Sequence, residues 1–313
     1  MPELSLIIPV MNEADNIAPL LLSVRTALAG MDYEVVLVDD GSTDTTRQCI
    51  REQADERTRL VELRKNYGQS NAMQAGIDES NGDFIAFIDG DLQNDPSDIP
   101  GMLRLLKEGE WDLVAGNRKN RQDGFILRKI PSRIANAMIR QITGVYIRDY
   151  GCTLKVMTRE IAGSLGLYGD MHRFIPVLAH QAGARMTQVD VKHHPRIHGK
   201  SKYGLGRTFK VMSDVMLLWY RKRYQQKPMH FFGSIGLTLC MISLLTLIYW
   251  LITSINNNAF RLSPLSWISL CLFLGGLQMI ATGFIADQLL RKEFASKEKK
   301  HYAVRQVFQP GKK

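Results

Sequence analysis

The stretch Phe84–Pro96, FIAFIDGDLQNDP, joins a short apolar run to a cluster of acidic and amide side chains. Residues 84–88 have the length and composition of a buried strand. Asp89-Gly90-Asp91 follows directly, and ligands of open α/β sheets bind at the carboxyl ends of the strands. One or two carboxylates, together with substrate phosphates, commonly hold Mg²⁺ or Mn²⁺. The motif therefore predicts a metal–phosphate site, and a solvated acidic turn is the alternative for the motif taken alone.

The chain before this stretch repeats the same arrangement of apolar strand and polar turn. Asn12-Glu13 follows one predicted strand, and Asp39-Asp40 follows the next. The predicted elements are strands at 4–10, 34–38 and 60–63, and helices at 16–29, 45–56 and 68–80. This alternation is typical of a parallel sheet covered by helices on both faces. Acidic clusters at one sheet edge repel each other unless a cation or hydrogen-bond donors compensate them, which favours a metal–nucleotide site.

The composition limits the classes of partner. The chain has 313 residues and a formal net charge of +9, which favours nucleic acid, an anionic membrane surface or a phosphorylated substrate. Its four cysteines include no C-x-x-C pair, so we expect reduced thiols in a protein that faces the cytosol. No basic segment precedes the first apolar run, so a signal peptide is not expected. The sequence contains neither the glycine-rich dinucleotide fingerprint nor a Walker A motif.

The order of the motifs resembles the family 2 glycosyltransferases of GT-A fold. The residues that carry this resemblance are Pro9-Val10-Met11-Asn12-Glu13, Val38–Asp44, Asn66-Tyr67-Gly68, Gly82-Asp83 and Asp89-Gly90-Asp91-Leu92-Gln93. The resemblance implies an α/β fold with a mixed, mostly parallel sheet flanked by helices. It also implies a nucleotide site formed by Pro9, Val10, Asn12, Glu13, Asp39, Asp40, Asp89 and Gly90. In the same family Mg²⁺ or Mn²⁺ would be held by Asp89, Asp91 and Gln93.

A basic region follows the predicted strand at 111–116. It contains Arg118, the polar loop 119–124 and Arg128, and Ser132 can cap a predicted helix at 134–142. Arginines near a helix N-terminus suit an anion, and a solvated basic face is the alternative. Beside the first half, this region resembles the phosphate clamp of polyprenyl-phosphate glycosyltransferases similar to dolichol-phosphate-mannose synthase. That resemblance implies that Arg118, Arg128 and Ser132 bind the acceptor phosphate.

Two further segments match the same group. Arg148–Lys155 resembles the segment that closes the sugar side of such sites, so Asp149 would contact the donor sugar or direct a proton, with a buried helix cap as the alternative. The segment 196–203 resembles a mobile basic loop in which Arg196 would neutralise the donor diphosphate, with a surface loop as the alternative. His193-His194 does not predict a shared metal site, because adjacent side chains on a strand point to opposite faces.

The C-terminal third predicts a membrane attachment. Residues 207–220 carry apolar residues at helical spacing and favour a helix on the membrane surface, with a core or oligomer-contact helix as the alternative. The uncharged segments 231–255 and 265–286 are each long enough to span a bilayer and predict a helical hairpin. The flanks of the hairpin are basic, whereas its connecting loop holds only Arg261. The positive-inside rule then predicts that both termini and the catalytic domain are cytoplasmic. The expected location is the inner (plasma) membrane, as a multi-pass protein.

The resemblance extends over essentially the whole chain and predicts four parts. These are a catalytic domain at 1–205, an interface helix at 206–228, a transmembrane hairpin at 229–288 and a basic tail at 289–313. Within the group, Asn120–Asp123, Asp149–Cys152 and Phe174–Pro176 resemble the undecaprenyl-phosphate 4-deoxy-4-formamido-L-arabinose transferases. The implied partners are a nucleotide sugar, UDP-linked rather than GDP-linked, a polyprenyl phosphate and membrane lipid, with a homo-oligomer, tetramer included, as the expected assembly.

The expected reaction is inverting transfer of a sugar to an undecaprenyl-type phosphate, for an envelope glycan or lipid A. Asp91, Asp149 and Arg118 are the predicted catalytic residues. One alternative is a processive polysaccharide synthase, but the nearest string to its Q-x-x-R-W motif, Gln288–Lys292, lacks the tryptophan and follows the last span. The other alternative is a non-catalytic nucleotide-sugar-binding membrane subunit. Nucleic-acid binding is not expected, because the basic residues alternate with an acidic pocket and two spans.

Overall fold

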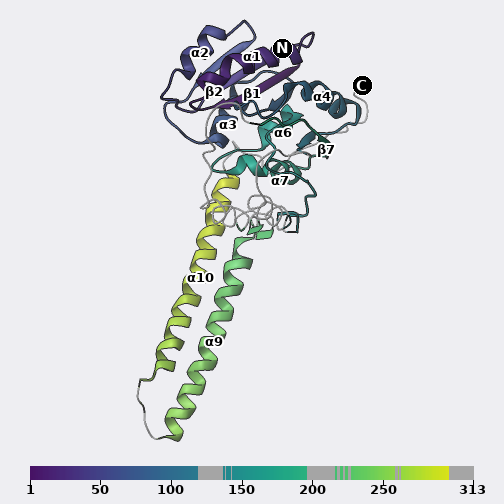
Figure 1. Cartoon of the computed structure of the whole chain (residues 1–313). Coiled ribbons are helices and arrows are strands. Elements are labelled where there is room, and N and C mark those ends of the chain that lie inside the picture. Colours follow the sequence, from purple (N-terminus) through teal and green to yellow (C-terminus); the bar gives the residue numbers. More distant parts are fainter. Residues whose placement is uncertain are drawn as a thin grey trace. The chain divides into compact units, whose positions relative to one another are not determined.

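The computed structural model describes residues 1–118, 137, 139–141, 143–195, 216, 219–220, 223–224, 227–257, 260 and 262–295 (Figure 1). The chain divides into two compact units, Met1–Val215 and Met216–Lys313, and each is considered by itself. The four-part division predicted from the sequence stays a prediction. Within the first unit, the described elements alternate between strands and helices as far as β5, as the sequence predicts.

The first unit contains seven strands in one sheet. The strands are β1 (Leu4–Val10), β2 (Tyr33–Asp39), β3 (Thr58–Glu62), β4 (Phe84–Phe87), β5 (Leu113–Asn117), β6 (Lys155–Thr158) and β7 (Met186–Asp190). The helices are α1 (Ala14–Ala27), α2 (Thr46–Gln53), α3 (Gln69–Glu79), η1 (Pro96–Asp98), α4 (Ile99–Glu108), α6 (Arg159–Ser164), η2 (Met171–Phe174) and α7 (Ile175–Gln181). The strand order is β3-β2-β1-β4-β6-β5-β7.

The sheet is mixed and mostly parallel, which confirms the predicted fold class. Strands β1, β2, β3 and β4 pair in parallel, and so do β5 and β7. Strand β6 lies between β4 and β5 and is antiparallel to both. The parallel register pairs Val10 with Asp39 and Asp39 with Glu62, so these strands end at one edge of the sheet. The turns that carry the predicted site residues begin at this edge.

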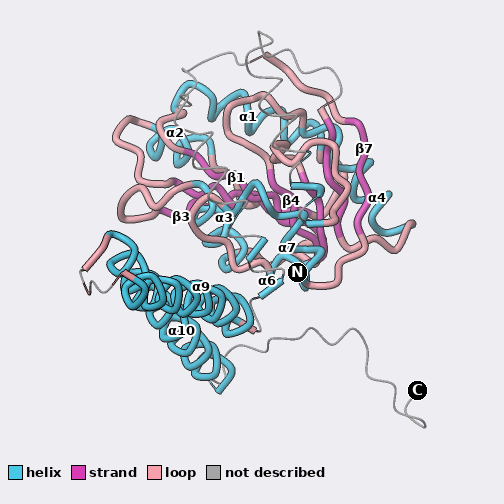
Figure 2. Tube along the Cα trace, turned by 90° about the horizontal axis from the view of Figure 1, so that it is seen from below, coloured by secondary structure: helices cyan, strands magenta, loops and turns pink. Residues whose placement is uncertain are grey.

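The strands direct alternate side chains to the two faces of the sheet. Helices lie on both of these faces (Figure 2). Leu4, Leu6 and Ile8 of β1 belong to a core cluster that includes buried residues of α1, α2 and α4. The opposite face is covered by α3, α6 and α7. The apolar strands are therefore buried on both sides, which explains why β1 and β2 read as nearly continuous apolar runs.

The structure differs from the sequence analysis in the region 155–181. It contains β6, α6, η2 and α7, none of which the sequence pattern predicts. Strand β6 has only four residues, KVMT, and its first side chain is Lys155, which is 1% exposed. A short strand that begins with a lysine lacks the apolar run by which the other strands are recognised.

The second unit contains two long apolar helices, α9 (Pro228–Asn256) and α10 (Pro264–Ala295), which lie side by side (Figure 1). Residues 228–256 and 264–290 are long and apolar enough to cross a membrane. Ser243 Oγ donates to the carbonyl of Ser269 at 2.7 Å, and Ser269 Oγ donates to the carbonyl of Ser243 at 2.8 Å. Reciprocal bonds of this kind stabilise helix contacts in lipid, where no water can replace them.

Gly236 allows the two helices to approach each other, and Gly236→Ala should lower the melting temperature in detergent. A Cβ atom at this position would lie 2.7 Å from the carbonyl oxygen of Gly276 and 2.7 Å from Ile280 Cγ1. Overpacking of this kind costs about 1–3 kcal/mol. Gly275→Ala is the matched control, because a Cβ atom there meets nothing within 4 Å. Equal melting temperatures for the two variants would contradict the close contact.

Candidate functional site

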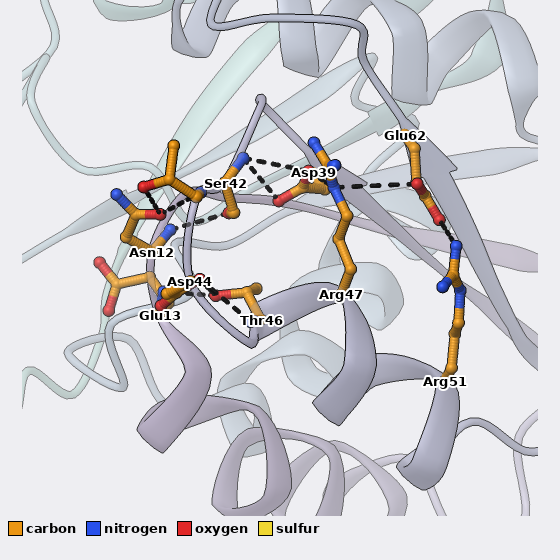
Figure 3. Close-up of polar contacts among 10 residues, drawn as sticks. Asn12, Glu13, Asp39, Ser42, Asp44, Thr46, Arg47, Arg51 and Glu62 are labelled. Atoms are coloured by element: carbon orange, nitrogen blue, oxygen red, sulfur yellow. Dashed lines mark hydrogen bonds and ion pairs between the residues drawn. The ribbon is translucent and has the colours of Figure 1, made fainter.

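The carboxyl end of β2 begins the first part of the site (Figure 3). Asp39 is fully buried, and both of its carboxylate oxygens accept from the backbone N–H of Ser42 at 3.2 Å. Arg47, in the first turn of α2, donates from Nε to Asp39 Oδ2 at 2.6 Å. Asp39, predicted as a nucleotide ligand, is thus oriented by its own turn and by an arginine that the sequence analysis did not select.

The turn after β1 is joined to the turn after β2 (Figure 3). Asn12 has a positive φ of 53°, and its backbone N–H donates to Ser42 Oγ at 2.9 Å. The Asn12 side-chain carbonyl accepts from the backbone N–H of Thr43 at 2.8 Å. The backbone N–H of Glu13 donates to Thr46 Oγ1 at 2.9 Å. The predicted nucleotide residues of both turns therefore form one connected surface.

Asp40 binds a different loop from the one that Asp39 contacts. Its carboxylate accepts from the backbone N–H groups of Tyr67 at 2.7 Å and Gly68 at 2.9 Å, directly before α3. Burial raises the pKa of Asp40, although these bonds oppose the shift. The structure therefore shows Asp40 as a support for the loop 66–68, and its predicted contact with nucleotide stays a prediction.

The Asp89-Gly90-Asp91 motif lies at the end of β4, next to the end of β1. Asp89 Oδ1 accepts from Gln69 Nε2 at 2.7 Å, and Asp89 Oδ2 accepts from Thr153 Oγ1 at 2.6 Å. Asp91 is 7% exposed and accepts from the backbone N–H of Gln93 at 3.2 Å. A Cβ atom at Gly90 would lie 2.7 Å from Val10 Cγ1, so a glycine is needed where β1 passes the motif.

The electrostatics of the motif fit a divalent cation. Burial and repulsion by Asp91 raise the pKa of Asp89 to about 6. A hard cation between two carboxylates removes that repulsion, and oxygen ligands are the type that Mg²⁺ and Mn²⁺ prefer. Within the described residues, no group of three or more His, Cys, Asp or Glu side chains is arranged to hold a metal. A cation at this motif would therefore need additional oxygen ligands, as phosphates supply.

The loop after the motif is attached to the segment that follows β7. Asn94 and His193 form an isolated antiparallel bridge, and the backbone N–H of His194 donates to the carbonyl of Gln93 at 2.9 Å. His194 Nε2 lies 3.1 Å from Asp95 Oδ2. Burial opposes ionisation of Asp95, but hydrogen bonds from Ser97 and His194 lower its pKa to about 2. These contacts hold Gln93 beside the segment that leads toward residue 196.

Arg118 and Asp149 form a bidentate ion pair at the end of β5. Arg118 Nε donates to Asp149 Oδ2 at 2.6 Å, and Nη2 donates to Oδ1 at 3.0 Å. The two side chains are only 10% and 13% exposed. Burial disfavours the charge, but the Asp149 carboxylate raises the pKa of Arg118 above its usual value. Two residues predicted for separate roles, acceptor binding and sugar contact, are thus coupled in the structure.

A buried lysine lies beneath this part of the site. Lys155 begins β6, where it is in register with Phe87 of β4 and Ala115 of β5. Its ammonium group donates to the backbone carbonyl of Cys152. Burial lowers the pKa of Lys155, and the nearby charges of Asp149 and Asp89 oppose that shift. The amine of Lys155 therefore lies between the strands that lead to Asp89 and Arg118.

Other predicted residues lie on β1 or outside the described part of the chain. Pro9 and Val10 belong to β1, where Val10 is buried and Pro9 is partly exposed. Arg128, Ser132 and Arg196 lie outside the described residues, so their predicted phosphate contacts stay predictions.

The sequence analysis missed four side chains that orient this site: Arg47, Gln69, Thr153 and Lys155. Gln69 and Thr153 are uncharged residues in segments that were noted for other reasons. Thr153 and Lys155 lie within the segment 148–155, and the family resemblance of that segment was the signal by which they could have been found. The role of Thr153 depends on its hydrogen bond to Asp89, which lies 64 residues earlier in the chain, and spacing in one sequence does not reveal such a contact.

Residues 5–166 match Glycosyl transferase family 2. The chain is 44% identical over 314 residues to dodecaprenyl-phosphate galacturonate synthase of Rhizobium johnstonii, covering 98% of this chain and 93% of that protein. It is 38% identical over 217 residues to undecaprenyl-phosphate 4-deoxy-4-formamido-L-arabinose transferase of Edwardsiella ictaluri, covering 68% and 66%. Glucosyl-3-phosphoglycerate synthase of Mycobacterium tuberculosis, solved with Mn²⁺, UDP-glucose and glycerol 3-phosphate, has a similar fold. The TM-score is 0.52 at 19% identity, covering 70% of this chain and 79% of that one.

The metal-free protein should lose stability through Asp89 as the pH rises, and Asp89→Asn should remove that loss. The pKa of this carboxyl is about 6 in the folded protein and about 3.9 in an unfolded chain. The folded state binds the proton more tightly, so the contribution to stability is complete below about pH 4 and is lost through about pH 6. The shift corresponds to roughly 1–3 kcal/mol.

Melting temperatures measured with EDTA at several pH values test this prediction. The variant should exceed the wild type in melting temperature near neutral pH and approach it in acid. Added Mn²⁺ should raise the melting temperature of the wild type at neutral pH and leave the variant nearly unchanged. Parallel pH profiles of the two metal-free proteins would show that Asp89 does not carry the penalty.

Proposed function

The chain belongs to glycosyl transferase family 2, and from this premise we propose that it transfers a sugar from a nucleotide sugar to a polyprenyl phosphate. The glycolipid would serve envelope glycan assembly or lipid A modification. The observation that carries the proposal is the meeting of Asp89, Asp91 and the Arg118–Asp149 pair at one edge of the sheet. The similarity to dodecaprenyl-phosphate galacturonate synthase over 98% of the chain supports the same reaction class.

The donor nucleotide would bind along the turns after β1 and β2. Hydrogen bonds with Ser42 hold Asp39 and Asn12 in place there, and Glu13 lies in the same connected surface. Asp89, Asp91 and Gln93 would hold Mg²⁺ or Mn²⁺ against the donor diphosphate. Bound there, the metal would supply Lewis-acid stabilisation of charge on the leaving diphosphate. Arg196 would add a second positive charge on the same group.

The acceptor phosphate would bind on the side of Arg118, with Arg128 and Ser132 as further ligands. A phosphate monoester is ionised near neutral pH, so its oxygen can attack the anomeric carbon without a strong general base. Attack from the face opposite the diphosphate inverts the configuration at that carbon. Asp149 holds the Arg118 guanidinium in a bidentate pair, so the orientation of Arg118 is set before the phosphate arrives.

The apolar helices α9 and α10 fit an enzyme whose acceptor stays in the bilayer. A long prenyl chain leaves a membrane only at high cost, so the catalytic domain has to work at the headgroup level. The basic flanks of the hairpin support a cytoplasmic position for both termini and for the catalytic domain. The segment 206–228 would lie on that face of the membrane, and the assembly would be a homo-oligomer.

The donor is proposed to be UDP-linked, and a uronic acid is the first sugar to test. The support for the uronic acid is a relative of 44% identity whose name specifies galacturonate. A 4-deoxy-4-formamido-L-arabinose donor is the second, because relatives of 38% identity carry that name. Processive synthesis is the alternative reaction, and it would give chains longer than one sugar.

A transfer assay with purified protein in detergent tests the proposal. Undecaprenyl phosphate and dodecaprenyl phosphate would be offered with Mg²⁺ or Mn²⁺ and a panel of UDP- and GDP-sugars, and the lipid product analysed by mass spectrometry. We expect one sugar per lipid phosphate, inverted at the anomeric carbon, and no product with EDTA. Growing saccharide chains would establish the processive alternative, and donor binding without product would establish a non-catalytic subunit.

Asp91→Ala should reduce turnover by at least about a hundredfold while the protein stays folded, because the variant loses one carboxylate ligand of the metal. Turnover and melting temperature would be measured on the same preparation. Asp15→Ala is the matched control, since Asp15 is an exposed carboxylate in the first turn of α1. Full activity of Asp91→Ala would remove the metal site from the proposed mechanism.

A further inference from the structure

Asp89 is held from two sides by uncharged donors. Gln69, the first residue of α3, reaches Oδ1, and the Thr153 hydroxyl reaches Oδ2 at 2.6 Å. A carboxylate oxygen has two lone pairs, so each oxygen keeps one acceptor position for another ligand. Both donors therefore restrict the rotation of the carboxylate without occupying all of its binding capacity.

Thr153 reaches Asp89 because of the direction of the chain before β6. Leu154 and Val156 belong to the core cluster on the face of α1 and α4. In an extended chain, residues 153 and 155 point to the other face of the sheet. Register places Lys155 beside Phe87, two residues before Asp89. The threonine hydroxyl is thus directed at the end of β4.

Lys155 fixes the turn that presents Thr153. Its ammonium group binds the carbonyl of Cys152, the residue directly before Thr153. A lysine that is 1% exposed is rare unless its charge has partners, because burial of an isolated charge is costly. The same turn carries Asp149, which binds Arg118, and the Gly151 N–H donates to Asp149 Oδ1 at 3.1 Å. Residues 149–155 therefore connect Asp89 with Arg118.

We propose that Thr153 is a positioning residue for Asp89, held in place by the contact of Lys155 with the Cys152 carbonyl. This inference rests on the proposed function, in which Asp89 is a metal ligand. Without the hydroxyl, Asp89 loses one of its two side-chain donors and its carboxylate can rotate away from the metal position. Loss of such a supporting hydrogen bond typically weakens metal affinity by about 10–100-fold.

Thr153→Val tests the proposal, since valine has nearly the same shape and no hydroxyl. Binding of Mn²⁺ would be measured by the loss of the free-ion EPR signal, with saturating UDP in one series and GDP in another. We expect the dissociation constant of Mn²⁺ to rise about tenfold or more, the metal concentration for half-maximal turnover to rise in parallel, and the KM for the lipid acceptor to stay unchanged. Thr153→Ser keeps the hydroxyl and should restore wild-type Mn²⁺ binding.

Thr143→Val is the matched control, because Thr143 is also buried and donates to a backbone carbonyl, that of Ile139, at 2.6 Å. It should bind Mn²⁺ as the wild type does. Thr153→Ala adds no atom and replaces Thr153→Val if the valine variant does not fold. Wild-type affinity in a folded Thr153 variant without the hydroxyl overturns the positioning role alone. A wild-type protein that binds no Mn²⁺ with either nucleotide overturns the metal site of the proposed function instead.

Discussion

Repulsion between carboxylates at one edge of a sheet is the constraint on which the rest of this site depends. Asp39 ends β2, and Asp89 and Asp91 follow β4; these two parallel strands flank β1 and end at the same edge. Buried carboxylates there would be destabilised without compensation. The protein compensates them locally with backbone N–H groups and Arg47 at Asp39, and with Gln69 and Thr153 at Asp89. Asp89 still keeps a pKa of about 6, so the apo site retains unfavourable charge that a cation can relieve.

This unfavourable charge at Asp89 shows how stability and function are divided between regions of the first unit. The alternating side chains of the strands build apolar layers on the two faces of the sheet, one of them the core cluster with α1, α2 and α4. Because those layers are well packed, the edge of the sheet can carry charges that are incompletely neutralised. Lys155 is the point where the two regions meet, since a core position holds an amine that binds the Cys152 carbonyl beside the site.

Much of the fold follows from the sequence, and much less of the site does. The mixed sheet was implied by the family resemblance. The strands up to residue 117 and the helices α1, α2 and α3 were predicted in their order along the chain, because apolar runs and turns alternate regularly there. Asp39, Asp89 and Asp91 were found for the same reason, since each ends an apolar run. Thr153 and Gln69 were not, because an uncharged side chain gives no signal until the fold brings it to a carboxylate. The Arg118–Asp149 pair joins residues 31 positions apart, and they meet only because β5, which precedes Arg118, pairs with β6, which follows Asp149.

The antiparallel direction of β6 explains why one segment can serve both halves of the site. A parallel strand delivers the residues that follow it to the carboxyl edge of the sheet, as β1, β2 and β4 do. The antiparallel strand β6, between β4 and β5, begins at that edge, so it delivers the residues that precede it. Residues 149–154 therefore enter the same edge as Asp89 and Arg118, and β6 then carries Lys155 back into the core between their strands. With β6 in the parallel direction, Thr153 would lie at the opposite edge of the sheet, and Asp89 would lose one of its two side-chain donors.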